Sequence, residues 1–348
     1  MLSVGLVGLP NAGKSTLFNL LTKRSVPAEN FPFCTIDPHD GIVEVEDKRL
    51  EELSKITNSN KIVPAAIEFR DIAGLVKNAS SGAGLGNQFL SHIREVDMIL
   101  MVIRTFVNDK IIHVENRVNP QDDYDILMLE LTIADTKSLE NQTNRLMKDK
   151  LRDKHCDQKL ELLAQIQAKL AEIKPAIEVI NKENYDKEVI AWRKSLNLLT
   201  DKVIMKLANI STDGVNIDFA ADTKLDIGLE SDLDGSSPEE RMEFGLEAQS
   251  GINKLIKSAF TKLNLETYLT TGEVETRAWT YTKGSTAPVC AGKIHTDFEK
   301  KFIKGEIIKF EDFVQLQGRK NSIEKGRMQV VGKDYIMQDG DVVEFKIG

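Results

Sequence analysis

The feature that most constrains the fold is a glycine-rich loop directly after the first apolar segment. Residues 1–7 are mostly apolar, and residues 8–15 are GLPNAGKS, which has the form G-x-x-x-x-G-K-[ST] of a phosphate-binding loop. In this pattern the glycines let successive backbone N–H groups point at one anion, Lys14 reaches the β- and γ-phosphates, and Ser15 binds Mg²⁺. The loop follows a strand and precedes a helix, here residues 16–21, whose positive N-terminus adds to the anion site. The sequence therefore predicts an α/β fold of the P-loop NTPase class.

Two later segments carry residue types that sense the γ-phosphate of a nucleotide. A loop after the first helix contains Thr35, the candidate second hydroxyl ligand of Mg²⁺. A predicted strand at residues 65–70 runs into Asp71, which would act in the outer shell of Mg²⁺, and Gly74, whose N–H would meet the γ-phosphate. The glycine-rich residues 76–87 are predicted to be a loop that changes order with the nucleotide.

The position after Gly74 bears on hydrolysis. Ras-type enzymes place a glutamine there to orient the attacking water, whereas this chain has Leu75, which cannot hydrogen-bond to water. Hydrolysis is therefore expected to be slow or to use another group. His113 is one of only five histidines and lies in the nucleotide-binding half, so it is the candidate for that group; the alternative is a packed or surface histidine.

A third segment bears on which base is bound. Residues 202–209 are a predicted strand that ends in Asn209, at the place where guanine-specific proteins have N-K-x-D. Here the four residues are Asn209, Ile210, Ser211 and Thr212, without the lysine and the aspartate, which argues against strict guanine recognition. Residues 223–226 (TKLD) offer a second match, but no apolar strand precedes them and they fall where the next strand is expected.

Composition restricts location and partners. The chain has 348 residues and a formal net charge of −8, so a nucleic-acid contact would need a local basic face, and DNA binding is not expected. Three widely spaced cysteines without metal-site spacing indicate reduced thiols. We find no signal peptide and no apolar run long enough for a membrane span, so a cytoplasmic protein without a membrane contact is expected.

A helical region follows the nucleotide-binding segments. Residues 122–197 lack glycine, and apolar residues recur in them at three- and four-residue steps, which predicts amphipathic helices long enough for an antiparallel hairpin. Pro175 and Asn181 are expected at a turn or a helix end. Residues 239–262 are predicted to be one helical stretch that closes the nucleotide-binding domain.

The last part of the chain has a different pattern. Short strands are predicted at residues 277–281, 307–310 and 341–345, with a short helix opening at 292–298 and a hinge at 269–272. About 75 residues of this kind suggest a ubiquitin-like β-grasp module. Four lysines on one stretch would contact RNA phosphates, or simply form a solvated face: Lys293, Lys300, Lys301 and Lys304.

Taken together, these motifs resemble those of the YchF family, the Obg-like ATPases, over nearly the whole chain. The distinctive strings are GLPNAGKST at 8–16, NFPFCT at 30–35, DIAGLVK at 71–77, GLGNQF at 84–89 and GKIHTDF at 292–298. The resemblance implies a G domain interrupted by a helical arm and followed by a TGS domain. We place the G domain at residues 1–125 and 198–270, the arm at 126–197 and the TGS domain at 271–348.

The resemblance also implies an activity and its residues. It implies Mg²⁺-dependent hydrolysis of ATP in preference to GTP, and association with the ribosome (large subunit or 70S-type particle), with RNA contacts through the TGS domain and the arm. His113 matches a histidine proposed to replace the catalytic glutamine, and Leu75 matches the hydrophobic substitution itself. The nucleotide-binding positions that match are Asn11, Ala12, Gly13, Lys14, Ser15, Thr16, Gly74, Asn209 and Ile210, and the Mg²⁺ positions are Ser15, Thr35 and Asp71.

Three departures from the family leave alternatives open. Thr212 stands where the family usually has Glu, residues 226–228 match the usual base-binding loop poorly, and Ala83 replaces a frequent Glu. The favoured hypothesis is a slow ATPase that acts as a ribosome-associated switch in translation or stress regulation. The alternatives are an Obg-type GTPase, and a nucleotide-gated binding module with little catalysis.

Overall fold

The computed structural model describes residues 2–24, 40–72, 84–108, 111, 117–148, 153–179, 185–244, 246–247 and 249–348. Four of the predicted site residues lie outside these ranges: Thr35, Gly74, Leu75 and His113. In the ranges given, no helix is both long enough and apolar enough to cross a membrane.

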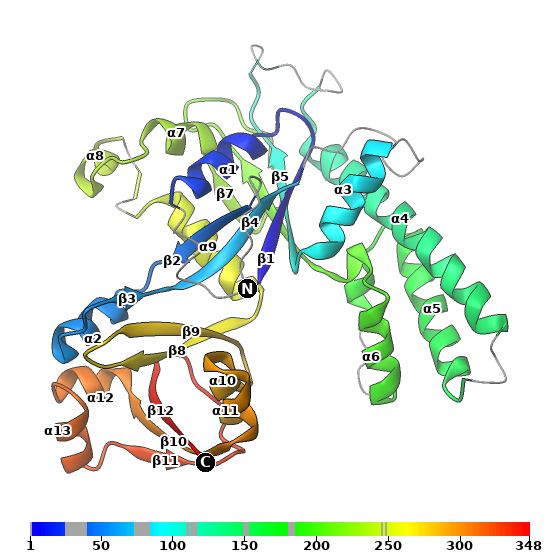
Figure 1. Cartoon of the computed structure of the whole chain (residues 1–348). Helices are drawn as coiled ribbons and strands as arrows, with labels where there is room; N and C mark the ends of the chain where they lie inside the picture. The colour runs from blue at the N-terminus through cyan, green and yellow to red at the C-terminus, as the bar shows by residue number, and fades with distance from the viewer. Residues whose placement is uncertain are drawn as a thin grey trace.

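A mainly parallel sheet forms the centre of the nucleotide-binding half (Figure 1). Within the described ranges its strands have the order β2-β4-β1-β5-β6-β7, and only β2 runs antiparallel to its neighbour. The strands are β1 (Ser3–Val7), β2 (Asp40–Val45), β4 (Ala65–Asp71), β5 (Met98–Arg104), β6 (Val203–Asn209) and β7 (Thr223–Leu225). The parallel strands end at one edge, where the phosphate-binding loop follows β1. Ligands of such sheets bind at this edge.

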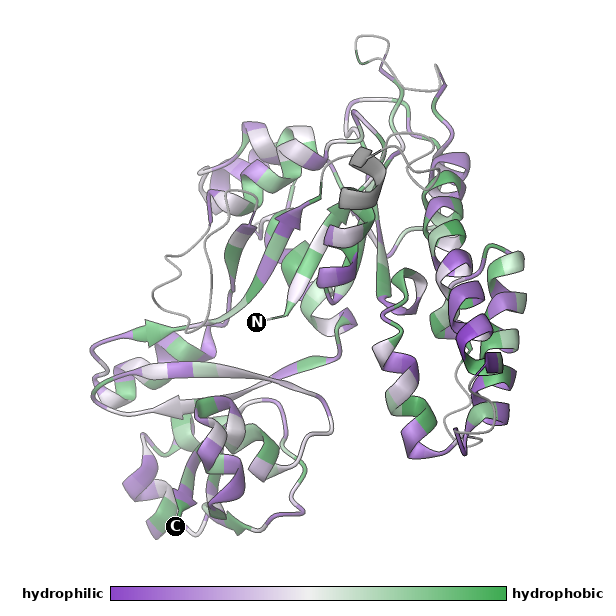
Figure 2. Ribbon diagram, turned by 45° about the vertical axis from the view of Figure 1, so that its right-hand side comes forward, coloured by the Kyte–Doolittle hydropathy of each residue, from purple (hydrophilic) through white to green (hydrophobic). Residues whose placement is uncertain are grey.

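Helices cover both faces of this sheet. On one face lie α1 (Lys14–Thr22) and α9 (Gly251–Lys262), and on the other lie α3 (Gly84–Glu95) and the first part of α4 (Pro120–Lys148). In β5 alternate side chains enter the two cores, and its seven residues are all buried, as is typical of a parallel strand covered on both faces. In Figure 2 the helices carry both hydrophobic (green) and hydrophilic (purple) residues, as expected of helices with one face against a core.

Two helix limits differ from the prediction. The predicted loop at 76–87 is wrong for its last residues, because α3 begins at Gly84. The predicted helix at 239–262 is instead α8 (Pro238–Glu243) and α9, which follow α7 (Ile227–Asp232). Gly251 fixes the start of α9: its N–H donates to Glu230 Oε1 (2.9 Å), and a Cβ there would lie 2.3 Å from Leu225 Cδ1.

The helical region projects from the sheet as an arm (Figure 1). It consists of α4, α5 (Cys156–Ala171) and α6 (Lys187–Ser195), with 3-10 helices η3 (Ala176–Glu178) and η4 (Leu199–Asp201). These helices share a core of their own, and Pro175 follows the end of α5, as predicted. At the base of the arm the buried Asp135 accepts hydrogen bonds from the Leu199 and Thr200 N–H groups (2.9 and 2.8 Å). The arm is therefore fixed to the chain that enters β6.

The C-terminal module is a second sheet with the strand order β11-β10-β12-β8-β9-β3 in the part of the chain described. Its strands are β8 (Leu265–Thr271), β9 (Thr276–Thr282), β10 (Phe302–Lys309), β11 (Gln329–Val331), β12 (Asp341–Ile347) and β3 (Ile62–Val63). Its helices are α10 (Ala287–Ile294), α11 (Thr296–Lys300), α12 (Phe310–Gln315) and α13 (Arg319–Glu324). This arrangement agrees with the predicted module of short strands around a helix.

The predicted hinge at residues 269–272 is wrong. Residues 265–271 form β8, in which Leu269 is fully buried and pairs with Val342 of β12. The second sheet thus begins ahead of residue 271, where the TGS domain was placed. The domain limits themselves stay predictions.

The most consequential feature for function is the connection between β2 and β4. It contains α2 (Arg49–Thr57) and β3, and β3 pairs in parallel with β9 of the second sheet. Arg49 donates to Asp339 Oδ2 (2.8 Å) and to the Thr267 hydroxyl (3.0 Å). A segment that lies in sequence between Thr35 and Asp71 is therefore built into the C-terminal module (Figure 1).

Candidate functional site

The loop after β1 has the backbone shape that an anion-binding loop needs. Gly13 has φ +103°, and a Cβ on it would lie 2.5 Å from Asn209 Nδ2. A Cβ on Gly8 would lie 2.5 Å from the Val102 carbonyl oxygen. Asn11 also has a positive φ, of 62°, which asparagine tolerates better than most residues. Close contacts therefore require both glycines of the sequence motif, and the conformation also requires Gly13.

Helix α1 presents its N-terminus at this loop. Gly13 is the N-cap and provides no side-chain cap, while Ser15 and Thr16 are exposed in the first turn. The first N–H groups of a helix have no partner within the helix, and the helix dipole makes this end positive. The arrangement is that of an anion site with hydroxyl groups beside it.

Lys14 is the charged residue of the site. Its side chain is 7% exposed, and Nζ donates to the Leu9 carbonyl oxygen at 2.9 Å, across the loop. Burial lowers the pKa of Lys14 below its usual range, and the Asp71 carboxylate opposes this shift. A phosphate group bound in the loop would supply the negative charge that keeps this ammonium protonated.

The residues at this edge fit a magnesium ion. Asp71 ends β4 and pairs in register with Leu6 of β1, so it lies beside the start of the loop. Its carboxylate is close enough to Lys14 to raise the pKa of that ammonium group. The described residues contain no group of three His, Cys, Asp or Glu side chains that would hold a metal by themselves. Mg²⁺ with nucleotides takes one or two protein oxygens, and phosphates and waters supply the rest. Ser15 and Asp71 match that donor set.

Asn209 connects the end of β6 to the loop. Its side chain is 4% exposed, Nδ2 donates to the Ala12 carbonyl oxygen (2.9 Å), and Oδ1 accepts from the Ile227 N–H (3.2 Å). The sequence predicted a base contact for Asn209 and Ile210, which stays a prediction. The structure adds a contact that sequence analysis missed, because only the order of β1, β5 and β6 brings these residues together.

Residue 226 is the last residue of the second, disfavoured match to N-K-x-D at residues 223–226. Residues 223–225 form β7 beside β6, as expected for the next strand. Asp226 follows it, and its carboxylate accepts from the Thr212 N–H at 2.6 Å and from the Leu229 N–H at 2.9 Å. The sequence signal for this carboxylate was the TKLD match, which did not predict its contact with Thr212.

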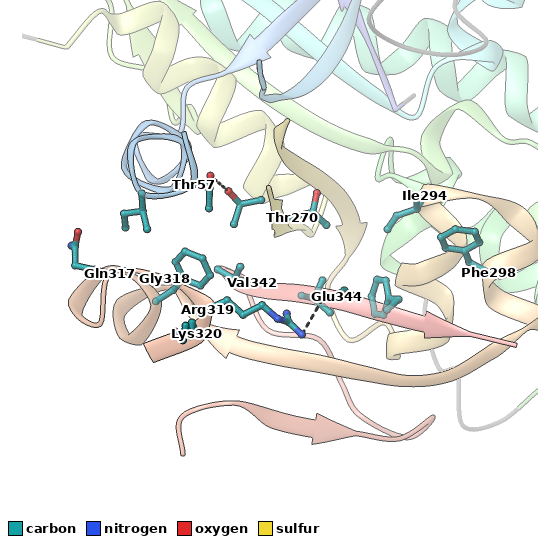
Figure 3. Close-up of a pocket in the computed structure, with 15 residues that line it drawn as sticks. Thr57, Thr270, Ile294, Phe298, Gln317, Gly318, Arg319, Lys320, Val342 and Glu344 are labelled. Atoms are coloured by element: carbon teal, nitrogen blue, oxygen red, sulfur yellow. Dashed lines mark hydrogen bonds and ion pairs between the residues drawn. The ribbon is translucent and has the colours of Figure 1, made fainter. Parts of the chain in front are cut away.

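A separate cavity of about 510 Å³ lies between α2 and the second sheet (Figure 3). Thr57 and Thr270 lie on one side of it, and Phe298 at one end. Arg319 lies on its floor, but Glu344 and Glu306 pair with its guanidinium (2.9 and 2.5 Å) and neutralise its charge. The cavity contains no predicted site residue, so it is not the nucleotide site.

The predicted RNA-contacting lysines lie in the C-terminal module. Lys293, Lys300 and Lys301 are exposed on or beside α10 and α11. Lys304 in β10 is half-buried and forms an ion pair with Glu306 at 3.0 Å. Three of the four ammonium groups therefore face solvent, as an electrostatic contact with phosphates would require.

Known proteins match the chain from end to end. A family model described as a 50S ribosome-binding GTPase matches residues 3–130, and a model named for the C-terminal part of YchF GTPases, described as a protein of unknown function, matches residues 265–348. Relatives named ribosome-binding ATPase YchF are 43% identical in Bacillus subtilis, over 99% of both chains, and 44% identical in Escherichia coli O157:H7, over 98% of both. The solved structure of the Schizosaccharomyces pombe YchF GTPase is 34% identical and superposes with a TM-score of 0.84, covering 99% of this chain and 97% of that one.

Proposed function

This chain belongs to the YchF family, and from that premise we propose that it is a P-loop ATPase that binds the ribosome. The observation that carries the proposal is the end-to-end identity with relatives that bear this name, together with an intact phosphate-binding loop. Family, fold class and membership among nucleoside-triphosphate hydrolases all agree with the expectations from sequence. ATP is the nucleotide we propose.

The described residues account for capture of the triphosphate. The backbone N–H groups of residues 11–16 would surround the β-phosphate, and Lys14 would leave the Leu9 carbonyl to contact the β- and γ-phosphates. Ser15 would hold Mg²⁺ directly and Asp71 through its outer shell, with Thr35 as the further predicted hydroxyl ligand. When bound, Mg²⁺ would neutralise charge on the β- and γ-oxygens.

For hydrolysis we propose a role for His113. Leu75 offers no hydrogen bond to water, so another group has to orient or deprotonate the attacking water, and a histidine titrates in the required range. Gly74 would donate its N–H to the γ-phosphate. This assignment of Gly74, Leu75 and His113 rests on the sequence motifs.

A switch function has a direct structural route. Thr35 and Asp71, which would both respond to the γ-phosphate, flank the β2–α2–β3–β4 segment. That segment contacts the second sheet through the β3–β9 pair and through Arg49. A change at either end of the segment would therefore be transmitted to the C-terminal module, where the exposed lysines lie. We propose that this module and the arm contact the large subunit or the 70S-type particle, in the cytoplasm.

A GTPase remains the second candidate, because the matched family model and the yeast structure carry GTPase in their descriptions. The sequence at residues 209–212 lacks the lysine and aspartate of guanine-specific proteins. A binding module with little catalysis is the third candidate.

Nucleotide competition, ribosome co-sedimentation and a hydrolysis assay together separate the three. Competition of ATP and GTP against a fluorescent nucleotide, with and without Mg²⁺, should show tighter binding of ATP that depends on Mg²⁺. Ribosome co-sedimentation with ATP, with ADP and without nucleotide should then differ between states. Tighter GTP binding would support the second candidate, and identical co-sedimentation with no hydrolysis would support the third.

A further inference from the structure

We propose that Asp226 supplies the carboxylate that recognises the bound base, by accepting a hydrogen bond from the 6-amino group of adenine. The proposal rests on the proposed nucleotide-binding function. It assigns base selection to a residue outside the 209–212 segment, in which Thr212 carries no carboxylate.

The position of Asp226 follows from the sheet. Strands β6 and β7 run in parallel with Asn209 opposite Leu225, so Ile210 and Asp226 leave the sheet at the same edge. The Ile210 N–H donates to the Leu225 carbonyl oxygen at 3.0 Å. The phosphate-binding loop leaves β1 at this edge too. A nucleotide whose phosphates lie over the loop would thus extend its base toward β6 and β7.

Contacts link Asp226 to the loop without a gap. Asn209 donates to Ala12, Ile227 donates to Asn209, and Ile227 Cδ1 lies 3.3 Å from where a Cβ on Gly13 would be. Asp226 directly precedes Ile227, and its carboxylate accepts a hydrogen bond from the Thr212 N–H. Ile210, Thr212 and Asp226 also line one cavity of about 170 Å³. The carboxylate therefore lies beside the segment that would face the base.

A carboxylate that faces C6 of the base would favour adenine over guanine. At C6 adenine carries an amino group, which donates, whereas guanine carries a carbonyl oxygen, which a carboxylate repels. Each Asp226 oxygen already accepts one backbone N–H, at residues 212 and 229. Each oxygen keeps one further acceptor position, and either can accept from the 6-amino group of adenine. A carboxylate acceptor also discriminates strongly against a base that lacks the amine, because the charged group then loses its partner.

The test pairs a change in the protein with a change in the ligand. Affinities of ATP, GTP and purine riboside triphosphate, which lacks the 6-amino group, are measured for the full-length protein and for Asp226→Asn, a substitution that retains helix-capping capacity. The control is Asp222→Asn, at the opposite end of β7, where the carboxylate accepts from the Lys206 N–H at 2.7 Å. If Asp226→Asn is poorly folded, Asp226→Ser replaces it.

The unmodified protein and Asp222→Asn should bind ATP about tenfold or more tightly than the analogue that lacks the amine. In Asp226→Asn that ratio should fall to within about threefold, with purine riboside triphosphate still bound. An unchanged ratio in Asp226→Asn, or an equal loss in Asp222→Asn, would overturn the assignment while leaving nucleotide binding intact. Failure of the unmodified protein to bind any of the three nucleotides would instead overturn the proposed function.

Discussion

The side-chain amide of Asn209 donates a hydrogen bond to the backbone carbonyl of Ala12, 2.9 Å away and 197 residues earlier in the chain. The helical arm lies between the two residues in sequence. The same side chain accepts from the Ile227 N–H, so one buried amide holds the phosphate-binding loop, the end of β6 and the start of α7 together. Asp226 and Asn209 are neighbours in space. Asn209 is expected to support the phosphate-binding loop, and Asp226 is expected to select the base.

Asn209→Ala should weaken binding of ATP and GTP to a similar extent, because it releases the loop and leaves the base contact of Asp226 in place. Loss of two buried hydrogen bonds should also lower the free energy of unfolding by about 1–3 kcal/mol. Urea denaturation and calorimetric titration measure the two effects. Asn216→Ala is the control, since this exposed amide bonds to the nearby backbone of Ser211 and Gly214. A large shift in ATP-to-GTP preference in Asn209→Ala would contradict the role as a loop tie.

Lys14→Met should reduce triphosphate affinity about a hundredfold or more, because a charge that contacts two phosphates is lost. Without nucleotide, Lys14→Met should be at least as stable as the unmodified protein. Methionine has a similar length, and burying it does not require the desolvation of a charge. Lys23→Met, which removes an exposed ammonium paired with Asp234, should leave affinity unchanged. A strongly destabilised Lys14→Met protein would argue that the Leu9 contact is mainly structural.

His113→Ala should lower the ATP turnover number about a hundredfold with little change in ATP affinity, as expected for a group that acts on the attacking water. His92→Ala, on the exposed face of α3, serves as the control and should hydrolyse ATP at the normal rate. Single-turnover hydrolysis and equilibrium binding separate the two parameters. Unchanged turnover would remove His113 from the mechanism.

Arg49→Ala should loosen the connection between the two halves. Its guanidinium contacts Asp47, Asp339 and Thr267, and about a quarter of its side chain is exposed, so we expect a loss of about 1–3 kcal/mol of stability. Hydrogen exchange in β8 and β12 should then cease to differ between ATP- and ADP-bound protein. Arg327→Ala, which removes an exposed side chain 3.7 Å from Asp312, should preserve that difference. If exchange in β8 and β12 still responds to the nucleotide in Arg49→Ala, the coupling takes another route.

Cys290 should be unreactive in the folded protein and should make stability depend on pH. It is fully buried, and burial raises the pKa of its thiol from 9.0 to about 12. Below pH 9 the thiol is protonated in both the folded and the unfolded state, so it adds no pH dependence to the free energy of unfolding. Between pH 9 and 12 this thiol ionises only in the unfolded chain, so stability falls as pH rises.

Two measurements check this. In a Cys34→Ser background, a disulfide reagent at pH 8 should label Cys290 only after denaturation. The Cys290→Ala protein should lose less stability above pH 9 than the unmodified protein. Rapid labelling without denaturant would contradict this.

Local patterns predicted a large part of the fold. The strands β4, β6, β9 and β12 were predicted to within two residues at each end, because runs of apolar residues report which faces are buried. The predicted strand at 307–310 covers only the end of β10, which begins at Phe302. The start of α9 at Gly251 and the burial of Leu269 in β8 were not predicted. Both depend on neighbours distant in sequence, Glu230 in one case and Val342 in the other.

The sequence by itself determined that this chain binds a nucleotide, because eight consecutive residues specify the loop, its glycines and its lysine. It also determined the order of the modules, because composition and periodicity change where one module gives way to the next. Only the tertiary structure decided that Asn209 supports the loop, that Asp226 reaches Thr212, and that residues 62–63 join the second sheet. These contacts depend on which strands become neighbours. Strand order is set by packing of the whole chain, and no short stretch of sequence records it.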